Sequence, residues 1–197
     1  AWVEGKKWGH GEKTFENGDT YKGMWEDGKK HGTGVYRFAN GEIFEGDWNM
    51  DKVEGKGTYH TVDGSTYEGD WKGDRVDGQG KFKSKAGDIY SGDVRDGKMD
   101  GIGVYQSSDG VKYEGEWRDG QKDGRGRLQG NDNPNNSQAS AAAANAAANS
   151  PNKTNKTFAN GDSYEGDWSS GRMNGYGVYR YANGDSYKGE WLDWVGF

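Results

Sequence analysis

The stretch GTGVYRFANGEIFEGDW, Gly32–Trp48, decides how the rest of the chain is interpreted. In each half, rings and glycines alternate with other residues, which is the period of a β-strand. Between the halves lies Asn40-Gly41, a dipeptide typical of tight hairpin turns whose central residues favour positive φ. The stretch therefore predicts a β-hairpin that carries its large rings on one face, with a link such as Glu26–His31 leading to the next hairpin.

The same pattern recurs along the whole chain. The motif Tyr-x-Gly-x-Trp is spaced by 23 residues, with one step of 51, and a Gly-x-Gly pair follows each first ring by 11 residues. The first rings of the motifs are Tyr21, Phe44, Tyr67, Tyr90, Tyr113, Tyr164 and Tyr187. Seven hairpins with about fourteen strands follow, and at ~4.8 Å per strand the sheet would be roughly 65 Å long.

The glycines indicate how such a sheet packs. A glycine between two rings leaves a flat strip of backbone on which a ring from a neighbouring strand can lie. Only 30% of the residues are hydrophobic, too few for a conventional two-layer core. We therefore predict an all-β fold, namely an elongated, single-layer antiparallel sheet of about seven tandem hairpins. An aromatic ladder replaces the second layer. Each repeat then buries its rings only against its neighbours, so that the stability of the array is nearly a sum of nearest-neighbour contributions along one dimension.

The long step marks an insertion. Relative to the 23-residue period, 28 residues are added at 129–156, rich in Ala and Asn and without any aromatic residue. Such a segment buries too little to order itself, and we expect disorder there. The predicted organisation is therefore repeats over 1–128, the insertion over 129–156, and over 157–197 the rest of the sixth hairpin, the seventh hairpin and a tail.

Charge and composition limit the function classes. The net charge of −6 disfavours nucleic acid and makes membrane contact less favourable, because both need a basic face. There are no cysteines, and no apolar run approaches a membrane span. The three histidines have no metal-ligand spacing, so we expect no metal site, and no cofactor motif is present.

The motif Tyr21-x-Gly23-x-Trp25, with Gly28 and Gly32-x-Gly34, resembles the MORN (membrane occupation and recognition nexus) repeat family at its 23-residue step. The resemblance covers the chain outside the insertion. It implies a non-catalytic scaffold of β-hairpins that binds proteins, often where membrane and cytoskeleton meet. It also implies a cytoplasmic location, with association to the cytoskeleton, an axoneme or the membrane periphery.

Three departures from the repeat stand out. Val94 occupies a position where the motif has Trp, which indicates tolerated drift, a bend in the sheet or a slot for a partner. Asp51 and Asp74 replace the linker glycine, a change that a turn tolerates. The chain begins within a repeat and ends in a tail around Trp194, which indicates either a capping tail or a fragment of a longer array.

Four of the motifs carry an acid pair, such as Glu68 and Asp70, with roughly the ~6.6 Å separation of glycosidase carboxylates. An enzyme needs one pair in a pocket, whereas here a pair recurs on an open face opposite basic residues of the neighbouring strand. We interpret the acids as structural and predict no catalytic residue.

The aromatic face is the strongest binding candidate, because exposed rings commonly mark protein interfaces. A partner helix could lie along it, or a second copy could associate. The predicted partner-binding residues are Tyr21, Trp25, Trp48, Trp71, Trp117, Trp168 and Trp191.

Two further hypotheses stay open. Lys81, Lys83 and Lys85 alternate onto one face and could contact an anionic lipid or phosphate, so that the chain would recognise phosphoinositide membranes. The chain could also be the targeting region of a larger enzyme such as a lipid kinase. Our leading hypothesis is a protein-binding scaffold.

Overall fold

The computed structural model describes residues 1–3, 5–130 and 161–194, and this part of the chain is built from β-strands alone. Two short strands, β1 (Trp2–Val3) and β2 (Lys6–Lys7), pair with each other near the N-terminus. Fourteen longer antiparallel strands follow. They are β3 (Gly9–Thr14), β4 (Thr20–Glu26), β5 (Lys29–Arg37), β6 (Ile43–Asn49), β7 (Lys52–His60), β8 (Thr66–Lys72), β9 (Arg75–Lys83), β10 (Ile89–Arg95), β11 (Lys98–Gln106), β12 (Lys112–Arg118), β13 (Gln121–Gln129), β14 (Ser163–Ser169), β15 (Arg172–Arg180) and β16 (Ser186–Trp194).

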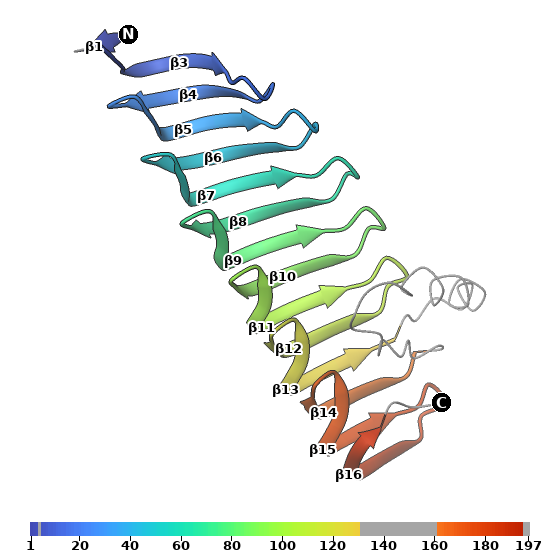
Figure 1. The fold of residues 1–197 in the computed structure, drawn as a ribbon. Coiled ribbons are helices and arrows are strands. Elements are labelled where there is room, and N and C mark those ends of the chain that lie inside the picture. Colours follow the sequence, from blue (N-terminus) through green and yellow to red (C-terminus); the bar gives the residue numbers. More distant parts are fainter. Residues whose placement is uncertain (4, 131–160, 195–197) are drawn as a thin grey trace. The chain divides into compact units, whose positions relative to one another are not determined.

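The chain divides into two compact units. The first contains residues 1–85 and 94–97, and the second contains residues 86–93 and those from 98 onward. Within each unit, a strand pairs with the strands that precede and follow it in the chain, as Figure 1 shows for β3 to β9 and for β11 to β16. The predicted all-β sheet of antiparallel hairpins is confirmed in both units.

The turns differ from the prediction in an informative way. In the predicted hairpin turns whose two residues are both described, only the glycine has positive φ, as at Gly41 with φ +95°, while Asn40 has ordinary φ. The Gly41 N–H donates to the Phe38 carbonyl, and the Asn40 side chain accepts from the Glu42 N–H. The loop is thus a turn closed by one left-handed glycine, the three-residue type, rather than the two-residue type.

The two-residue turns lie instead in the predicted links. Asp27 and Gly28 both have positive φ, at +50° and +81°, and they join the directly paired residues Glu26 and Lys29. A turn with two positive φ values matches the twist of antiparallel strands, so pairing continues through the link. Strand β5 consequently begins at Lys29, three residues before the predicted hairpin start at Gly32.

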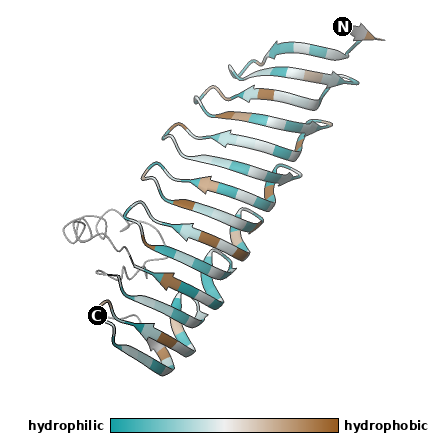
Figure 2. Cartoon of the chain, turned by 180° about the vertical axis from the view of Figure 1, so that it is seen from behind, coloured by the Kyte–Doolittle hydropathy of each residue, from teal (hydrophilic) through white to brown (hydrophobic). Residues whose placement is uncertain are grey.

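A register irregularity interrupts the strand pair that each of these short turns joins. Between β6 and β7, for example, Gly46 pairs with Gly57 and Trp48 pairs with Val53, so three residues of β7 face one residue of β6. Such bulges increase the local bend of a strand. In Figure 2 hydrophobic residues form only isolated bands along the strands, which agrees with the low aliphatic content.

The first residue of the predicted insertion, Gln129, belongs to a strand. Gln129 is the last residue of β13 and pairs with Ser163 of β14. The Gly130 N–H donates to the Asp162 carbonyl. In an uninterrupted repeat the equivalent bond is made by the Phe38 N–H, which donates to the Glu42 carbonyl. The remaining part of the predicted insertion, 131–156, lies outside the described residues, as do 157–160 and the end of the tail, 195–197.

Candidate binding face

The rings of the Tyr-x-Gly-x-Trp motifs form a ladder, here called the inner row. The Tyr21 ring contacts the indoles of Trp25 and Trp48 with centroid distances of 5.1 and 5.4 Å, both nearly perpendicular. Phe44 contacts Trp48 and Trp71 in the same way. Edge-to-face contacts are favourable because the positive edge of one ring meets the negative face of the next. In the second unit the same geometry links Tyr90, Trp117, Tyr113, Trp168, Tyr164, Trp191 and Tyr187.

Glycine is required beneath these rings. A Cβ on Gly34 would lie 2.4–2.5 Å from the hydroxyl oxygen and ring carbons of Tyr21, and one on Gly23 would lie 2.6 Å from the same hydroxyl. The ring therefore lies directly on the backbone of two strands, and its hydroxyl donates to the Met24 carbonyl. This close approach explains why the glycines recur with the tyrosines.

Each inner-row indole is also held by a hydrogen bond to backbone. The Trp48 Nε1–H donates to the Gly34 carbonyl at 3.3 Å, and the Trp71 Nε1–H donates to Gly57 at 3.2 Å. Among the described residues, six indoles make this bond, from Trp25, Trp48, Trp71, Trp117, Trp168 and Trp191. A buried indole needs such an acceptor, because its N–H gives up its hydrogen bond to water on burial and would otherwise remain unpaired.

A second set of side chains, the outer row, lies beside the inner row: Tyr36, Tyr59 and Phe82 in the first unit, Tyr105, Leu128 and Tyr179 in the second. We include in the outer row Phe38 and Tyr181, whose rings pack against Tyr36 and Tyr179. The Tyr36 hydroxyl donates to Asp19 Oδ2 at 2.5 Å, while the Asp19 Oδ1 accepts from the Ala39 N–H. Burial, with the nearby Asp19, raises the pKa of Tyr36 to about 12. The bond from Tyr36 is the main cause that lowers the pKa of Asp19.

These tyrosine–carboxylate pairs were missed by the sequence analysis, although a 17-residue offset marks them. Tyr59 donates to Glu42 and Tyr179 to Asp162, both across this offset. Where the acid is absent the tyrosine is absent too, and the offset then joins Ser65 to Phe82 and Val111 to Leu128. At this offset the chain thus pairs a tyrosine with a carboxylate, or two residues that are neither.

Two lysines lie against inner-row rings and were also missed. Lys30 Nζ lies 4.1 Å from the ring centroid of Trp48, and Lys122 Nζ lies 5.3 Å from that of Trp168. Both follow an inner-row tryptophan by five residues, a position held by Val53 after Trp48. Burial lowers the pKa of Lys122 to about 8, because the ammonium has lost much of its water. The attraction between the ammonium and the face of the indole offsets part of the lost hydration free energy.

The predicted partner-binding rings are mostly interior. Their exposed fractions are 7% or less for Tyr21, Trp25, Trp48, Trp117 and Trp168, whereas Trp71 and Trp191 are partly exposed. The buried rings have little surface to offer, so the contact of this set with a partner stays a prediction. Exposed rings on this face include Phe82 of the outer row at 42%, Tyr181, which stacks on Tyr179, at 46%, and Tyr187 of the inner row at 47%.

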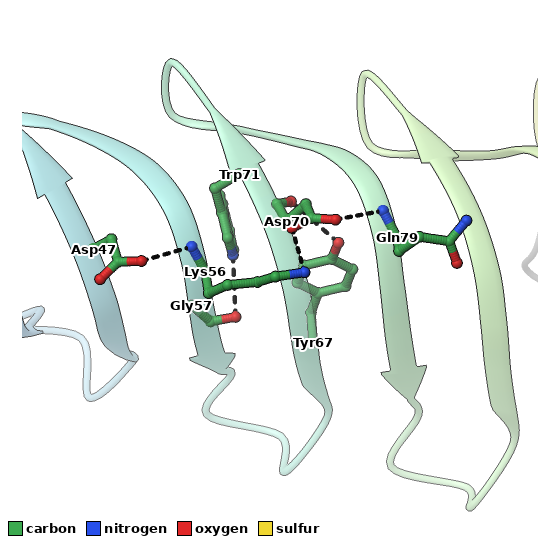
Figure 3. A network of polar contacts seen from close by, with 7 residues as sticks. All are labelled: Asp47, Lys56, Gly57, Tyr67, Asp70, Trp71 and Gln79. Atoms are coloured by element: carbon green, nitrogen blue, oxygen red, sulfur yellow. Dashed lines mark hydrogen bonds and ion pairs between the residues drawn. The ribbon is translucent and has the colours of Figure 1, made fainter.

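The second acid of each pair binds the backbone, whereas the first acid Glu45 lines a shallow cavity beside Lys22 and Val35. Figure 3 shows the Asp70 carboxylate accepting from the Gln79 N–H at 2.8 Å and pairing with Lys56 Nζ, while Asp47 accepts from the Lys56 N–H. The same bond across nine residues is made by Asp93, Glu116 and Asp167. Each acid binds an N–H in the bulge, where the ladder is interrupted, and this geometry supports the structural interpretation.

The predicted lysine stripe is less concentrated than expected. Lys81 and Lys83 are exposed on β9, but Lys85 lies beyond the end of that strand, where its N–H donates to the Ser65 hydroxyl. Lys81 pairs across the strands with Glu68. The charge of Lys85 acts on Asp63 and contributes to the lowered pKa of that carboxyl. Acids therefore offset two of the three lysines, and lipid contact by this set stays a prediction.

Among the described residues, no group of three or more His, Cys, Asp or Glu residues has an arrangement that could hold a metal ion. No helix in that part of the chain has the length and apolar character needed to cross a bilayer.

Fold and ring geometry together define an antiparallel hairpin repeat protein with an aromatic ladder. The model of the MORN repeat family matches residues 1–20, 21–43, 44–66, 67–89, 90–112, 113–133 and 164–186. The chain belongs to the MORN repeat family, whose repeat is a non-enzymatic module.

A search of the curated proteins gives no match. One similar solved structure is the TCP domain of SAS-4 (dCPAP) from Drosophila melanogaster, in complex with a proline-rich motif of Ana2 (dSTIL). The two chains are 15% identical, with 64% of this chain and 84% of that chain covered and a TM-score of 0.28.

Proposed function

We propose that this chain is a non-catalytic scaffold that binds protein partners on its aromatic face. The observation that carries the proposal is the incomplete burial of the outer row. Phe38 and Tyr59 are partly exposed, and Phe82 and Tyr181 are exposed. Aromatic side chains held in place by packing lose little entropy on binding, so they are favourable interface residues.

The inner row supports this role indirectly. Because Tyr21 and its counterparts lie on the glycine strips, the outer rings rest on a rigid base. Tyr36, for example, contacts Phe38 on one side and Trp48 on the other. The contacts with a partner then come from the outer rings together with the partly exposed Trp71 and Trp191. A partner helix laid across the outer row, or a second copy of the chain, fits this surface.

Location follows the family. MORN repeats occur in proteins associated with membranes or the cytoskeleton. We propose a cytoplasmic place at such a structure, with protein contacts as the attachment.

A pair of matched double variants tests the proposal. Phe38→Ser with Tyr181→Ser removes two outer rings at equivalent positions of two repeats. Ile102→Ser with Tyr176→Ser removes two apolar side chains of the opposite face, where they are 61% and 53% exposed. Proximity labelling in cells from the full chain and from both variants identifies the neighbours of each. Sedimentation of the purified chains measures self-association.

We expect the outer-ring variant to lose neighbours that the opposite-face variant keeps, or to lose self-association, while both retain the strand circular-dichroism spectrum. If the two variants label the same proteins and sediment alike, the aromatic face is not the binding surface. If only the opposite-face variant loses neighbours, the proposed face is the wrong one.

A further inference from the structure

The inner row is interrupted at one place in the first unit. Where both motifs carry tryptophan, an inner ring contacts the indole of its own motif and that of the next motif, as Tyr21 contacts Trp25 and Trp48. Tyr90, whose own motif supplies Val94, contacts Trp117 of the next motif. Tyr67 has Trp71 of its own motif at 5.5 Å, but the next motif supplies Val94. The consequence is visible in burial: Tyr67 is partly exposed, whereas Tyr21, Phe44, Tyr90, Tyr113 and Tyr164 are at most 2% exposed.

Two other side chains lose their cover at the same place. Tyr36 and Tyr59 each contact the indole of the following motif, at 5.8 and 6.3 Å, whereas their counterpart Phe82 is 42% exposed. Val76 is partly exposed, while Val53, at the equivalent position of the preceding repeat, is 8% exposed. We call the group Tyr67, Val76, Gly80, Phe82 and Val94 the Val94 notch. Val94 itself is buried, at 8% exposed, whereas the other four residues reach solvent, and all five belong to the first unit.

The notch also lacks a hydrogen-bond donor. Position 94 follows Gly80 by 14 residues, the offset at which Trp48 donates to Gly34 and Trp71 donates to Gly57. Valine has no side-chain N–H, so the carbonyl of Gly80 does not receive this bond. The segment that carries Val94 is held in place by other contacts, since the Gly97 N–H donates to the Val76 carbonyl and Arg75 pairs with Asp96.

We propose that the Val94 notch is a binding site for an indole, namely a tryptophan side chain of a protein partner. The proposal rests on the proposed function, because it names the chemistry that a partner brings to the aromatic face. Its basis is internal: at the six equivalent positions among the described residues, the occupant is an indole that stacks edge-to-face and donates to a glycine carbonyl. Aliphatic side chains lack the donor, and phenylalanine lacks it as well.

The test uses the full chain and N-acetyl-tryptophanamide as the probe, followed by heteronuclear and aromatic NMR. We expect saturable shifts at Tyr67, Gly80 and Phe82. N-acetyl-1-methyltryptophanamide keeps the ring but lacks the N–H, and should bind about three- to tenfold more weakly, the effect of one hydrogen bond. N-acetyl-leucinamide should cause no saturable shift. Equal binding of the three probes, or shifts spread evenly along the chain, would overturn the proposal.

Two variants place the site. Val94→Trp supplies the missing indole and should abolish probe binding. Trp48→Val opens the same kind of notch around Tyr21 and Gly34, and should add a second set of shifts there. If Val94→Trp binds the probe as well as the natural chain does, the notch is not the site. Absence of a second set in folded Trp48→Val would also count against the proposal, because an open indole position would not suffice for binding.

Failure of the notch and failure of the proposed function can be told apart. The probe experiment involves no partner protein, and the double variants at Phe38 and Tyr181 leave the five notch residues unchanged. A chain that binds no probe but loses neighbours when Phe38 and Tyr181 are replaced is a scaffold without an indole site. A chain that binds the probe and keeps all neighbours has the site without the proposed outer-row interface.

Discussion

Glu68 and Asp70 stand two residues apart in one motif, yet their surroundings differ. Asp70 accepts a hydrogen bond from the Gln79 N–H and pairs with Lys56, and the bond from Lys56 is the main cause that lowers the pKa of Asp70. Glu68 is exposed and faces Lys81 across the strands. The bulge explains the difference, because it leaves an N–H without a strand partner and only Asp70 reaches it.

Replacing Asp70 by Ala should therefore cost about 1–2 kcal/mol of unfolding free energy, since the Gln79 N–H loses its acceptor. Glu68→Ala, the matched control, should cost less than ~0.5 kcal/mol, as expected for an exposed charge. Because the pKa of Asp70 is lowered in the folded state, its contribution is present at neutral pH. It should be lost as pH falls below about 3.9 and through the lowered value. Urea unfolding of both variants at pH 7 measures the contrast, and equal losses would contradict it.

At the scale of an element, the strand pair β12–β13 places a charge in the aromatic core. Trp117 pairs directly with Lys122, whose side chain is 7% exposed and lies over the rings of Tyr113 and Trp168. The equivalent residue in the next repeat is Met173, which pairs with Trp168 and is 3% exposed. The strand geometry therefore accepts an apolar side chain here, and the ammonium is tolerated at a cost in desolvation.

The pKa of Lys122 predicts how stability changes with pH. In the folded chain the pKa is about 8, below the unfolded value of about 10.4, so between these values the unfolded chain binds more protons. Stability should rise with pH in this range, by up to about 3 kcal/mol from Lys122. Above pH ~10 the trend should reverse, because burial raises the pKa of the ladder tyrosines, such as Tyr21, to about 12.

Lys122→Met, which introduces the side chain that Met173 places at the equivalent position, should remove the rise between pH 8 and 10 and increase stability at pH 7. Thermal unfolding from pH 6 to 10 measures both effects. An unchanged pH profile in this variant would show that Lys122 is not the group responsible.

At the scale of the whole molecule, each unit has a core made of contacts between neighbouring strands. In the first unit the core cluster contains Tyr21, Trp25, Phe44, Trp48 and Val53, and the outer rings pack against it. In the second unit Trp168 contacts Tyr164 of its own strand, β14, and Tyr113 of β12, which belongs to the preceding repeat. Cores of this kind transmit the loss of one ring to adjacent repeats and only weakly beyond them.

Trp168→Val should therefore destabilise the second unit by roughly 3–5 kcal/mol, because a large buried ring and its hydrogen bond are lost. Hydrogen exchange followed by mass spectrometry should show faster exchange in β12 to β15, while β4 to β7 keep their protection. If hydrogen exchange accelerates equally in both units, the chain unfolds as one cooperative body. That outcome would contradict a core in which each repeat is stabilised only by its neighbours.

Much of the fold is predictable from the sequence because it depends on local spacing. The alternation around Tyr-x-Gly-x-Trp predicted the strands and their shared aromatic face, and the recurrence of glycine predicted rings lying on backbone. The turn types were assigned to the wrong loops, because Asn40-Gly41 suits a turn with two positive φ values. In the structure the turn with two positive φ values lies at Asp27-Gly28, because Glu26 and Lys29 on either side of it pair directly.

Sequence by itself determined the repeat, its family and the face on which the rings lie, since these follow from periods of 2 and 23 residues. Tertiary structure decided which rings are buried and which reach solvent. Trp48 and Trp71 belong to identical motif positions, yet their exposure depends on side chains contributed by the adjacent repeats. The same reason applies to Val94: the missing ring is visible in the sequence, but the uncovered Tyr67, Val76 and Phe82 come from two neighbouring strands.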